Sequence, residues 1–403
     1  MANTLITPIW TLKEVGRSLY NNLKFAANVS RSYDDQYIQA GAKVGWYVNA
    51  RLPQRFKTTR GQALQIQPIT DNVVPIALQD QLNVAFGWSS AQGTMEVEEV
   101  RRRYTIPAGG QIANTVDADG LYRCYGDVFW MLKADDLGNQ EYLDASALLT
   151  DAGVPTPRVM VTSAKMMAHI VGKGLTLFNP QAVISEGFKQ GIYGRNVLGW
   201  EEWYQDQNVA THTVGPAGGA PLVNGANQTG SSLLLKGFTA AAAKRLNRGD
   251  AFTLAGVEPV NPQSYYSLGT LQTFTALADV YSDASGNATV PINPAIVPSG
   301  NGQTVTASPA DNAPVTLQGT PGDRWQQALG FFEDAFALVT ADLEMPKSGK
   351  AERIRARDLG LALRFWEDSL ISDDSHPSRL DILVGWKTVR PEMAIRLWGK
   401  VTP

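Results

Sequence analysis

Hydrophobic and polar residues alternate along two stretches in the first quarter of the chain. Residues 44–52 and 74–88 each place apolar side chains at alternate positions, a period typical of a β-strand with one apolar face. Between them, residues 53–72 (PQRFKTTRGQALQIQPITDN) form a longer connection than most loops inside a domain, which indicates a loop with a task of its own. The pattern predicts a hairpin arm over residues 43–90 that reaches away from the core of its own chain.

Apolar residues at helical spacing predict helices in two regions. Near the N-terminus, positions 12–26 fit a short amphipathic helix. From residue 95 to residue 132 the same spacing predicts a long helix, which Pro107 and the pair Gly109 and Gly110 are expected to break or kink.

The composition changes abruptly after residues 136–213, in which helical and strand patterns alternate as in α/β or α+β proteins. Residues 214–320 hold only nine charged residues, and short strands with turn signals replace the helices. We interpret residues 214–321, the β-rich segment, as a separate small domain inserted into the rest of the chain. The mixed pattern then resumes and ends in two strands joined at Arg390 and Pro391.

The composition of the 403-residue chain is that of a globular protein with a large core. Hydrophobic residues make up 44% and charged residues 18%, which predicts two or three domains. A net charge of -3 argues against a protein that grips nucleic acid through a strongly basic face. The single cysteine, Cys124, is predicted to be a buried thiol in a reducing cytoplasm. No signal segment or membrane span is predicted, so neither secretion nor membrane insertion is expected.

Four carboxylates stand among large apolar side chains in FFEDAFALVTADLEMP, residues 331–346. Asp334 and Asp342 could be the acid pair of a carbohydrate-active enzyme. The alternation of residues 332–342 favours instead a strand buried on much of both faces, with the acids toward its ends. We therefore predict no catalytic residues and keep the enzyme as an alternative. A surface adhesin, suggested by the β-rich segment, is a second alternative and would require export.

Other candidate chemistry is sparse. His169, His212 and His376 lie far apart and outside HExxH or HxH motifs, so no metal site is predicted. No complete phosphate-binding glycine motif is present, so no cofactor is predicted. The RGD sequence at 248–250 is interpreted as a tight turn that opens a strand, and the basic run at 347–357, which acids flank, as a source of salt bridges.

Five stretches together resemble a known family. They are NARLPQRFKTTRG, RGDAFTLAGVEPVNP, SDASGNATVPINPAIV, DAFALVTADLEMP and RLDILVGWKTVRPEMAIRL. The combination resembles the major coat protein of tailed bacteriophages, in particular the short-tailed Salmonella phage type, in which a β-rich domain is inserted into the α+β Hong-Kong-97-type capsid fold. The resemblance implies an N-terminal arm (1–42), an extended loop hairpin (43–90), a spine helix with peripheral domain (91–135), a first part of the axial domain (136–213), the inserted domain (214–321), and the completion of the axial and peripheral domains (322–403).

The resemblance implies a structural protein rather than an enzyme. Many copies are expected to assemble as pentamers and hexamers into an icosahedral shell that encloses double-stranded DNA without sequence-specific binding. A scaffolding protein, separate because the segment before the arm is short, and a portal ring are the other implied partners. The expected location is the virion capsid, assembled in the bacterial cytoplasm without any membrane.

The same resemblance draws attention to the basic residues of the arm. Arg51, Arg55, Lys57 and Arg60 are predicted to contact a neighbouring subunit, where they could pair with carboxylates and set the register of the contact. Some relatives cross-link a loop lysine to a neighbour's asparagine. We expect Lys57 to contribute non-covalent contacts only.

Overall fold

The computed structural model of the chain describes residues 23–32, 47–58, 61–62, 66–67, 69, 72–78, 80–89, 106–135, 137–174, 196–356, 361–372 and 374–399. The chain divides into two units. Unit 1 consists of Met1–Ala50, Val73–Gly120 and Phe336–Val389, and unit 2 of Arg51–Asn72, Leu121–Ala335 and Arg390–Pro403. Helices and β-sheets occur in both units, so the α+β class predicted from the sequence is confirmed.

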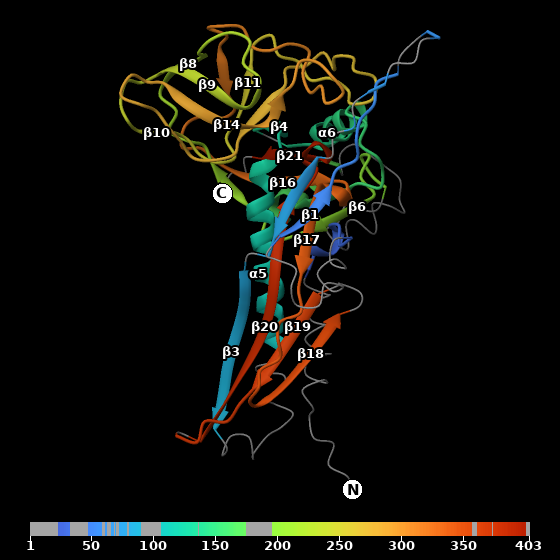
Figure 1. Cartoon of the computed structure of the whole chain (residues 1–403), viewed down its shortest axis with the longest axis vertical. Helices are drawn as coiled ribbons and strands as arrows, with labels where there is room; N and C mark the ends of the chain where they lie inside the picture. Colours follow the sequence, from blue (N-terminus) through green and yellow to red (C-terminus); the bar gives the residue numbers. More distant parts are fainter. Residues whose placement is uncertain are drawn as a thin grey trace. The chain divides into compact units, whose positions relative to one another are not determined.

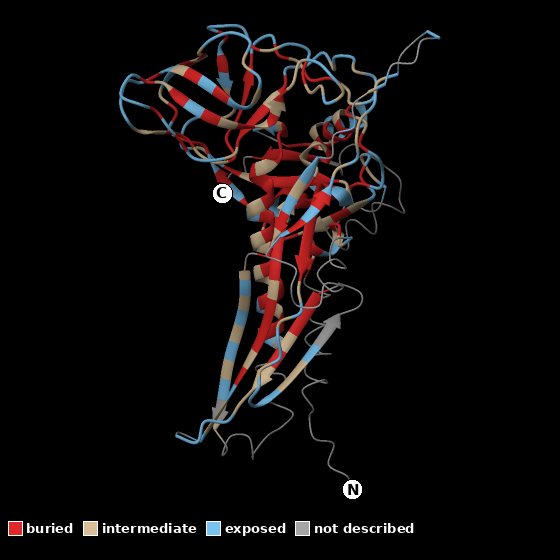
Figure 2. Ribbon diagram, viewed as in Figure 1, coloured by how far each residue is buried: buried red, intermediate tan, exposed pale blue. Residues whose placement is uncertain are grey.

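The main sheet of unit 1 is antiparallel and centred on one long strand, β20 (Ser375–Thr388). The strand order is β17-β20-β19-β18, and β3 also pairs with β20 (Figure 1). These strands are β3 (Asp80–Ser89), β17 (Phe336–Thr340), β18 (Lys350–Ala356) and β19 (Leu361–Glu367). All five residues of β17 are buried, whereas no described side chain of β3 is (Figure 2). The core of unit 1 includes β17, the apolar positions of β20, the first half of β19 and buried side chains of α5.

The strands of the predicted hairpin arm do not pair with each other along their whole length. Strand β1 (Tyr47–Arg51) pairs with β2 (Val73–Ala77), but the chain then continues into β3, whose ten residues all pair with β20. The prediction that residues 74–88 form one strand of a projecting hairpin is wrong in its pairing. β20 is 14 residues long and leaves a row of backbone donors and acceptors that β3 satisfies.

The carboxylate-rich stretch contains a shorter strand than predicted. Glu333–Ala335 forms the 3-10 helix η4, and only Phe336–Thr340 is strand. Asp342 lies beyond the strand, where its Oδ2 is 3.7 Å from Nε of Arg353. The strand is buried on both faces, as predicted. The acids lie outside it because a carboxylate is costly to bury without partners.

Helix α5 (Ile106–Cys124) coincides with part of the predicted long helix. It begins directly before Pro107 and continues through Gly109 and Gly110, so the glycine pair does not break it, and residues 90–105 lie outside the described part of the chain. The helix ends earlier than predicted, at Cys124, because the 3-10 helix η3 (Tyr125–Asp127) follows and Trp130–Ala134 forms β4, a strand paired in parallel with β21. Pairing within a buried sheet outweighs the helical spacing of these residues. The Cys124 thiol is buried, as predicted.

The N-terminal segment is tied to α5 by a buried carboxylate. Asp117 is fully buried and accepts hydrogen bonds from the backbone N–H groups of Lys24 at 2.6 Å, Phe25 at 3.3 Å and Ala26 at 2.8 Å. These bonds satisfy donors at the start of the 3-10 helix η1 (Ala26–Asn28). Most of the amphipathic helix predicted over positions 12–26 lies outside the described residues.

Replacing Asp117 with alanine is expected to lower the free energy of unfolding by about 1–3 kcal/mol, because two buried N–H groups and one partly buried N–H group lose their acceptor. Asp117→Asn, which keeps one acceptor oxygen, should lose less. Chemical denaturation followed by tryptophan fluorescence measures both, since Phe25 stacks on Trp386 with ring centres 5.2 Å apart. Equal stability of the two variants and the unmodified protein would contradict this role.

Unit 2 contains a mixed sheet with the order β4-β21-β16-β5-β6, and β7 also pairs with β16. Its elements follow the predicted alternation of helices and strands: α6 (Asn139–Asp151), β5 (Val159–Thr162), α7 (Ala164–Gly174), β6 (Glu202–Gln205), β7 (Thr211–Thr213), β16 (Arg324–Phe331) and β21 (Ala394–Gly399). The predicted join of the last two strands is present, because the 3-10 helix η5 (Pro391–Met393) connects β20 to β21.

The β-rich segment has a six-stranded antiparallel sheet with the order β15-β11-β12-β14-β9-β8, and β10 pairs with β13. The strands are β8 (Gly219–Val223), β9 (Gly230–Phe238), β10 (Lys244–Leu246), β11 (Ala251–Leu254), β12 (Thr273–Ala276), β13 (Val280–Tyr281), β14 (Ala288–Ile296) and β15 (Val315–Leu317). Among the described residues, buried side chains from these strands and their connecting loops form a hydrophobic cluster whose members all lie within the segment. Every second residue of β14 is buried and the residues between are exposed or half-buried, as a two-residue period requires (Figure 2).

Candidate functional site

The arm loop, residues 51–72, carries the four basic residues predicted to contact a neighbouring subunit. Arg51 is exposed at the end of β1. The guanidinium of Arg55 lies 3.7 Å from the Glu392 carboxylate. Arg60 lies outside the described residues. Arg55 therefore has an ion-pair partner in its own chain, and its contact with a neighbour stays a prediction.

Lys57 has partners in the β-rich segment of its own chain. Its Nζ lies 4.2 Å from the centre of the Tyr265 ring and donates to Oε1 of Gln303 at 3.1 Å. The Lys57 backbone is held by Gln67, whose Oε1 accepts from the Lys57 N–H at 2.9 Å and whose Nε2 donates to the Lys57 carbonyl. These contacts give the arm loop a defined position within unit 2.

Large apolar side chains are exposed on the arm loop. Among the described residues, no separate segment of similar length carries more of them. Exposed apolar side chains concentrated on one loop are typical of a surface that another protein covers. The exposed fractions are 59% for Phe56, 86% for Ile66 and 78% for Ile69.

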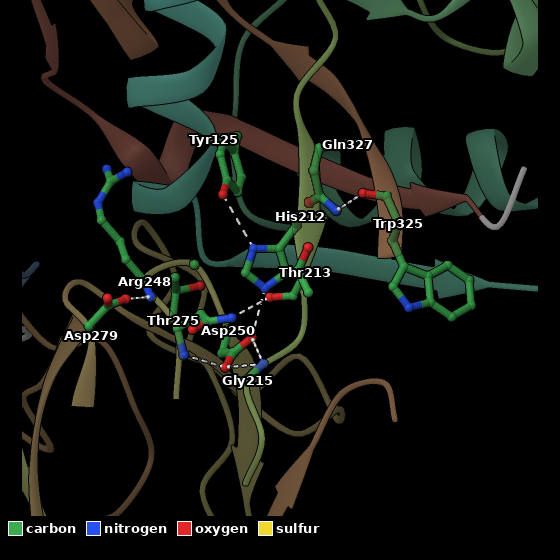
Figure 3. Close-up of polar contacts among 12 residues, drawn as sticks. Tyr125, His212, Thr213, Gly215, Arg248, Asp250, Thr275, Asp279, Trp325 and Gln327 are labelled. Carbon is green, nitrogen blue, oxygen red and sulfur yellow. Dashed lines mark hydrogen bonds and ion pairs between the residues drawn. The ribbon is translucent and has the colours of Figure 1, made fainter. Parts of the chain in front are cut away.

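A buried polar network joins the β-rich segment to the mixed sheet of unit 2 (Figure 3). His212, on β7, lies with its Nε2 2.7 Å from Oδ1 of Asp250 and its Nδ1 3.3 Å from the hydroxyl of Tyr125. Because a carboxylate can only accept, Nε2 carries a proton and donates to Asp250, while Nδ1 and the Tyr125 hydroxyl share the second hydrogen bond. His212 thus connects Tyr125 of η3 to Asp250 in the turn that precedes β11. Burial of the Tyr125 hydroxyl raises its pKa.

The Asp250 carboxylate also binds two backbone N–H groups. Its Oδ2 accepts from Gly215 at 3.0 Å and from Asn247 at 2.7 Å. Gly215 lies where the chain enters the β-rich segment, and a Cβ there would be 2.6 Å from Oδ2 of Asp250, so a side chain does not fit. One carboxylate therefore fixes both the start of the segment and the turn that opens β11.

The RGD sequence forms the predicted turn. Arg248 and Gly249 are turn residues, and β11 begins directly after Asp250. The backbone N–H of Arg248 donates to Oδ1 of Asp279 at 2.9 Å (Figure 3). The Arg248 guanidinium donates to Oδ1 of Asp127 at 2.7 Å. The turn is thereby bound to η3, and its charged residues serve the packing of unit 2.

Arg396, on β21, also forms hydrogen bonds with the β-rich segment. The side chain is fully buried and donates to the Gly249 carbonyl and to Oγ1 of Thr275, both at 2.9 Å. Burial lowers the pKa of Arg396 to about 10. Because the pKa is below that of the unfolded chain, burying the charge costs stability at neutral pH, and the cost is relieved only as the pH rises through 10. Nearby negative charge, including that of Asp250, offsets part of this cost.

Sequence patterns did not reveal this network, since 38 positions separate His212 from Asp250 and 87 separate it from Tyr125. The available signal was the scarcity of charge in the β-rich segment, which makes an Asp at a predicted turn conspicuous. In the described part of the chain, no group of histidine, cysteine and acidic residues is arranged to hold a metal ion. No described helix is long and apolar enough to span a bilayer.

Comparison with known protein families identifies the family of the chain. The family described as P22 coat protein, gene protein 5, matches residues 3–399, which is nearly the whole chain. The chain belongs to the P22 coat protein family. A comparison with curated proteins finds none with significant similarity to this coat protein.

Solved phage structures are similar to this coat protein over most of its length. A structure from Mycobacterium phage Che8 has 14% identity and a TM-score of 0.47, and covers 93% of this chain and 90% of its own. The mature capsid of bacteriophage PhiM1 has 12% identity and a TM-score of 0.46, and covers 95% and 88%. The capsid of Ralstonia phage GP4 has 10% identity and a TM-score of 0.46, and covers 94% and 89%. These similarities are low, and the assignment rests on the family match.

Membership of the P22 coat protein family confirms the resemblance to phage coat proteins and gives the protein its function. It is a major capsid protein, many copies of which form an icosahedral shell, and its location is the virion capsid. The arm loop, which exposes apolar side chains, is therefore part of a shell subunit. So is the buried network, which binds the β-rich segment to the mixed sheet.

Proposed function

We propose that the arm loop is the element through which one coat subunit binds the next. The observation that supports this role is the set of exposed apolar side chains on the loop, Phe56, Ile66 and Ile69. Burying apolar surface is worth about 25 cal/mol per Å², so these side chains gain free energy once a second copy covers them. A shell multiplies such contacts, and many weak interfaces make a stable container.

The basic residues of the loop have a different task in this proposal. Arg51, Arg55, Lys57 and Arg60 steer the approach and fix the register of the contact, because exposed charge pairs add specificity and association rate more than affinity. Arg55 and Lys57 do so while they remain bound within their own chain. Pentamers and hexamers are the capsomers that this contact builds.

The β-rich segment, residues 214–321, acts in this proposal as an inserted domain that supports the subunit. Its own hydrophobic cluster favours folding as a semi-autonomous unit, and the network around Asp250 holds it in place. The remaining domain boundaries proposed from the sequence follow the same plan, with an N-terminal arm (1–42) and axial and peripheral parts on either side of the segment.

The proposed shell has three further partners. A separate scaffolding protein guides assembly in the bacterial cytoplasm, a portal ring occupies one vertex, and the shell encloses double-stranded DNA. The net charge of -3 suits a container, since a strongly cationic wall would bind DNA through counterion release. Packaging then needs no recognition of DNA sequence.

The proposed function includes no enzymatic activity. Asp342, one of the two acids considered for a carbohydrate-active enzyme, lies 3.7 Å from Arg353, and Arg353 also donates to the Leu343 carbonyl at 3.2 Å. An acid paired in this way serves the sheet edge beside it. Asp334 lies in η4 and is exposed.

Replacing Phe56 with alanine tests the role of the arm loop. We expect the concentration of subunits required for assembly to rise roughly tenfold, which corresponds to about 1.4 kcal/mol per contact. Light scattering with a scaffolding partner and electron microscopy of the product measure the effect. The free subunit should keep its stability, because Phe56 is 59% exposed.

The matched control is Tyr281→Ala, which removes a ring of similar exposure, 63%, from the β-rich segment. It should leave the assembly threshold near that of the unmodified protein. If both variants, or neither, shift the threshold, the arm loop is not the element that binds the next subunit.

A further inference from the structure

A contact 246 positions apart in sequence joins the arm loop to the β-rich segment. The Lys57 ammonium lies over the Tyr265 ring, 4.2 Å from its centre, and donates to Gln303 at 3.1 Å. All three side chains are half-buried. A cation over an aromatic face and a hydrogen bond from the same nitrogen together define one position for the lysine.

Both sides of this contact are held by further bonds. On the arm loop, Gln67 binds the N–H and the carbonyl of Lys57 and so braces the backbone from the opposite side of the loop. On the β-rich segment, Nε2 of Gln303 donates to the Val305 carbonyl at 3.1 Å. That bond turns Oε1 of Gln303 toward Lys57, which therefore meets an acceptor already in place.

The backbone of Tyr265 adopts a strained conformation. Its φ of 61° lies in the left-handed region, which costs a bulky residue about 1–3 kcal/mol unless its surroundings enforce it. Its N–H donates to the Asn261 carbonyl at 2.9 Å, and its hydroxyl donates to the Asn301 carbonyl at 2.9 Å. The ring is thus held at both ends, with its face toward Lys57.

A second bond holds the arm loop at another point. Arg55, two residues before Lys57, lies 3.7 Å from Glu392. Phe56 stands between these two anchored residues and is 59% exposed. The side chain of Phe56 therefore stays exposed although the residues on both sides of it are held by contacts within the chain.

We propose that Tyr265 and Gln303 are positioning residues, which hold the arm loop of their own chain in the orientation in which it meets a second copy. A loop fixed before binding loses less conformational entropy when it binds, and so binds more tightly without any new contact across the interface. The β-rich segment thereby acts on assembly through the loop of its own subunit. This effect on assembly rests on the proposed role of the arm loop, whereas the anchoring itself does not.

The anchoring is tested on the free subunit by the rate at which trypsin cleaves after Arg60, followed by mass spectrometry. We expect Lys57→Met and Tyr265→Leu each to raise this rate about two- to fivefold, the effect of losing one cation–π contact near the surface. The double variant should be cleaved no faster than the faster single variant, because both substitutions remove the same contact. Tyr266→Leu is the matched control, since Tyr266 is the neighbouring ring, is 77% exposed, and should leave the rate unchanged.

Assembly of the same variants tests whether anchoring of the arm loop promotes shell formation. Lys57→Met and Tyr265→Leu should raise the subunit concentration needed for shells by a similar two- to fivefold. Cleavage rates equal to that of Tyr266→Leu, or effects that multiply in the double variant, would overturn the anchoring. Faster cleavage with an unchanged or lower assembly threshold would overturn the positioning role. A normal threshold for Phe56→Ala combined with faster cleavage here would remove the proposed function alone and leave the anchoring intact.

Discussion

Asp250→Ala is expected to lower the free energy of unfolding of unit 2 by about 3–5 kcal/mol, the range for breaking a buried charged network from one side. The substitution leaves three donors without their acceptor: Nε2 of His212 and the backbone N–H groups of Gly215 and Asn247. It also removes negative charge that stabilises the buried guanidinium of Arg396. Each of these losses acts on the junction between the β-rich segment and the mixed sheet.

Asp250→Asn should be nearly as harmful, because a carboxamide of the same size offers one acceptor oxygen and brings an N–H₂ group toward donors. Chemical denaturation measures both variants, and hydrogen exchange at β11 and β7 shows where the loss occurs. Asp311→Asn serves as the control, since Asp311 is exposed and pairs with Lys236 at 3.1 Å, and such a pair is worth less than about 1 kcal/mol. If Asp250→Ala and Asp311→Asn cost the same, the buried network does not seat the segment.

The strands of the β-rich segment could be predicted because their signals are local. The sequence DASGN marks the turn between β13 and β14, and the structure shows why: Oδ1 of Asp283 accepts from the N–H groups of Ser285 and Asn287, both at 2.8 Å. In the same way, the helical spacing of α6 and α7 and the alternation around β5 require no knowledge of distant residues. The resemblance of several longer stretches to phage coat proteins then identified the family correctly.

Strand partners could not be predicted in this way. A two-residue period tells which face of β3 is apolar, but not that Asp80 pairs with Val384 or that Ser89 pairs with Ser375. The same limit applies to the candidate site, where His212 meets Tyr125 and Asp250 through the fold alone. Lys57 was singled out for a contact with a neighbouring subunit, yet its partners Tyr265 and Gln303 carried no signal that pointed to it.

Arg158→Ala is the second substitution expected to be severe, with a loss of about 3–5 kcal/mol in the free energy of unfolding. Arg158 is buried, and no carboxylate among the described residues forms an ion pair with it. Its guanidinium instead donates to carbonyl oxygens of Ser146 at 2.9 Å, Pro155 at 3.1 Å and Val154, and to Oγ1 of Thr150 at 2.9 Å. The cation thus caps the C-terminal end of α6, where the helix dipole favours positive charge.

Alanine would leave these acceptors without donors and open a cavity, whereas lysine keeps the charge and can serve some of the acceptors from a single nitrogen. Arg158→Lys should therefore recover part of the lost stability, and Arg158→Met, which fills space without donating, should recover less. Denaturation curves rank the three variants, and hydrogen exchange of the amides of Ala152 and Val154, which donate to Leu148 and Leu149 at 2.9 Å, reports the fraying of α6. If methionine matched or exceeded lysine, packing rather than hydrogen bonding would be the main contribution of Arg158.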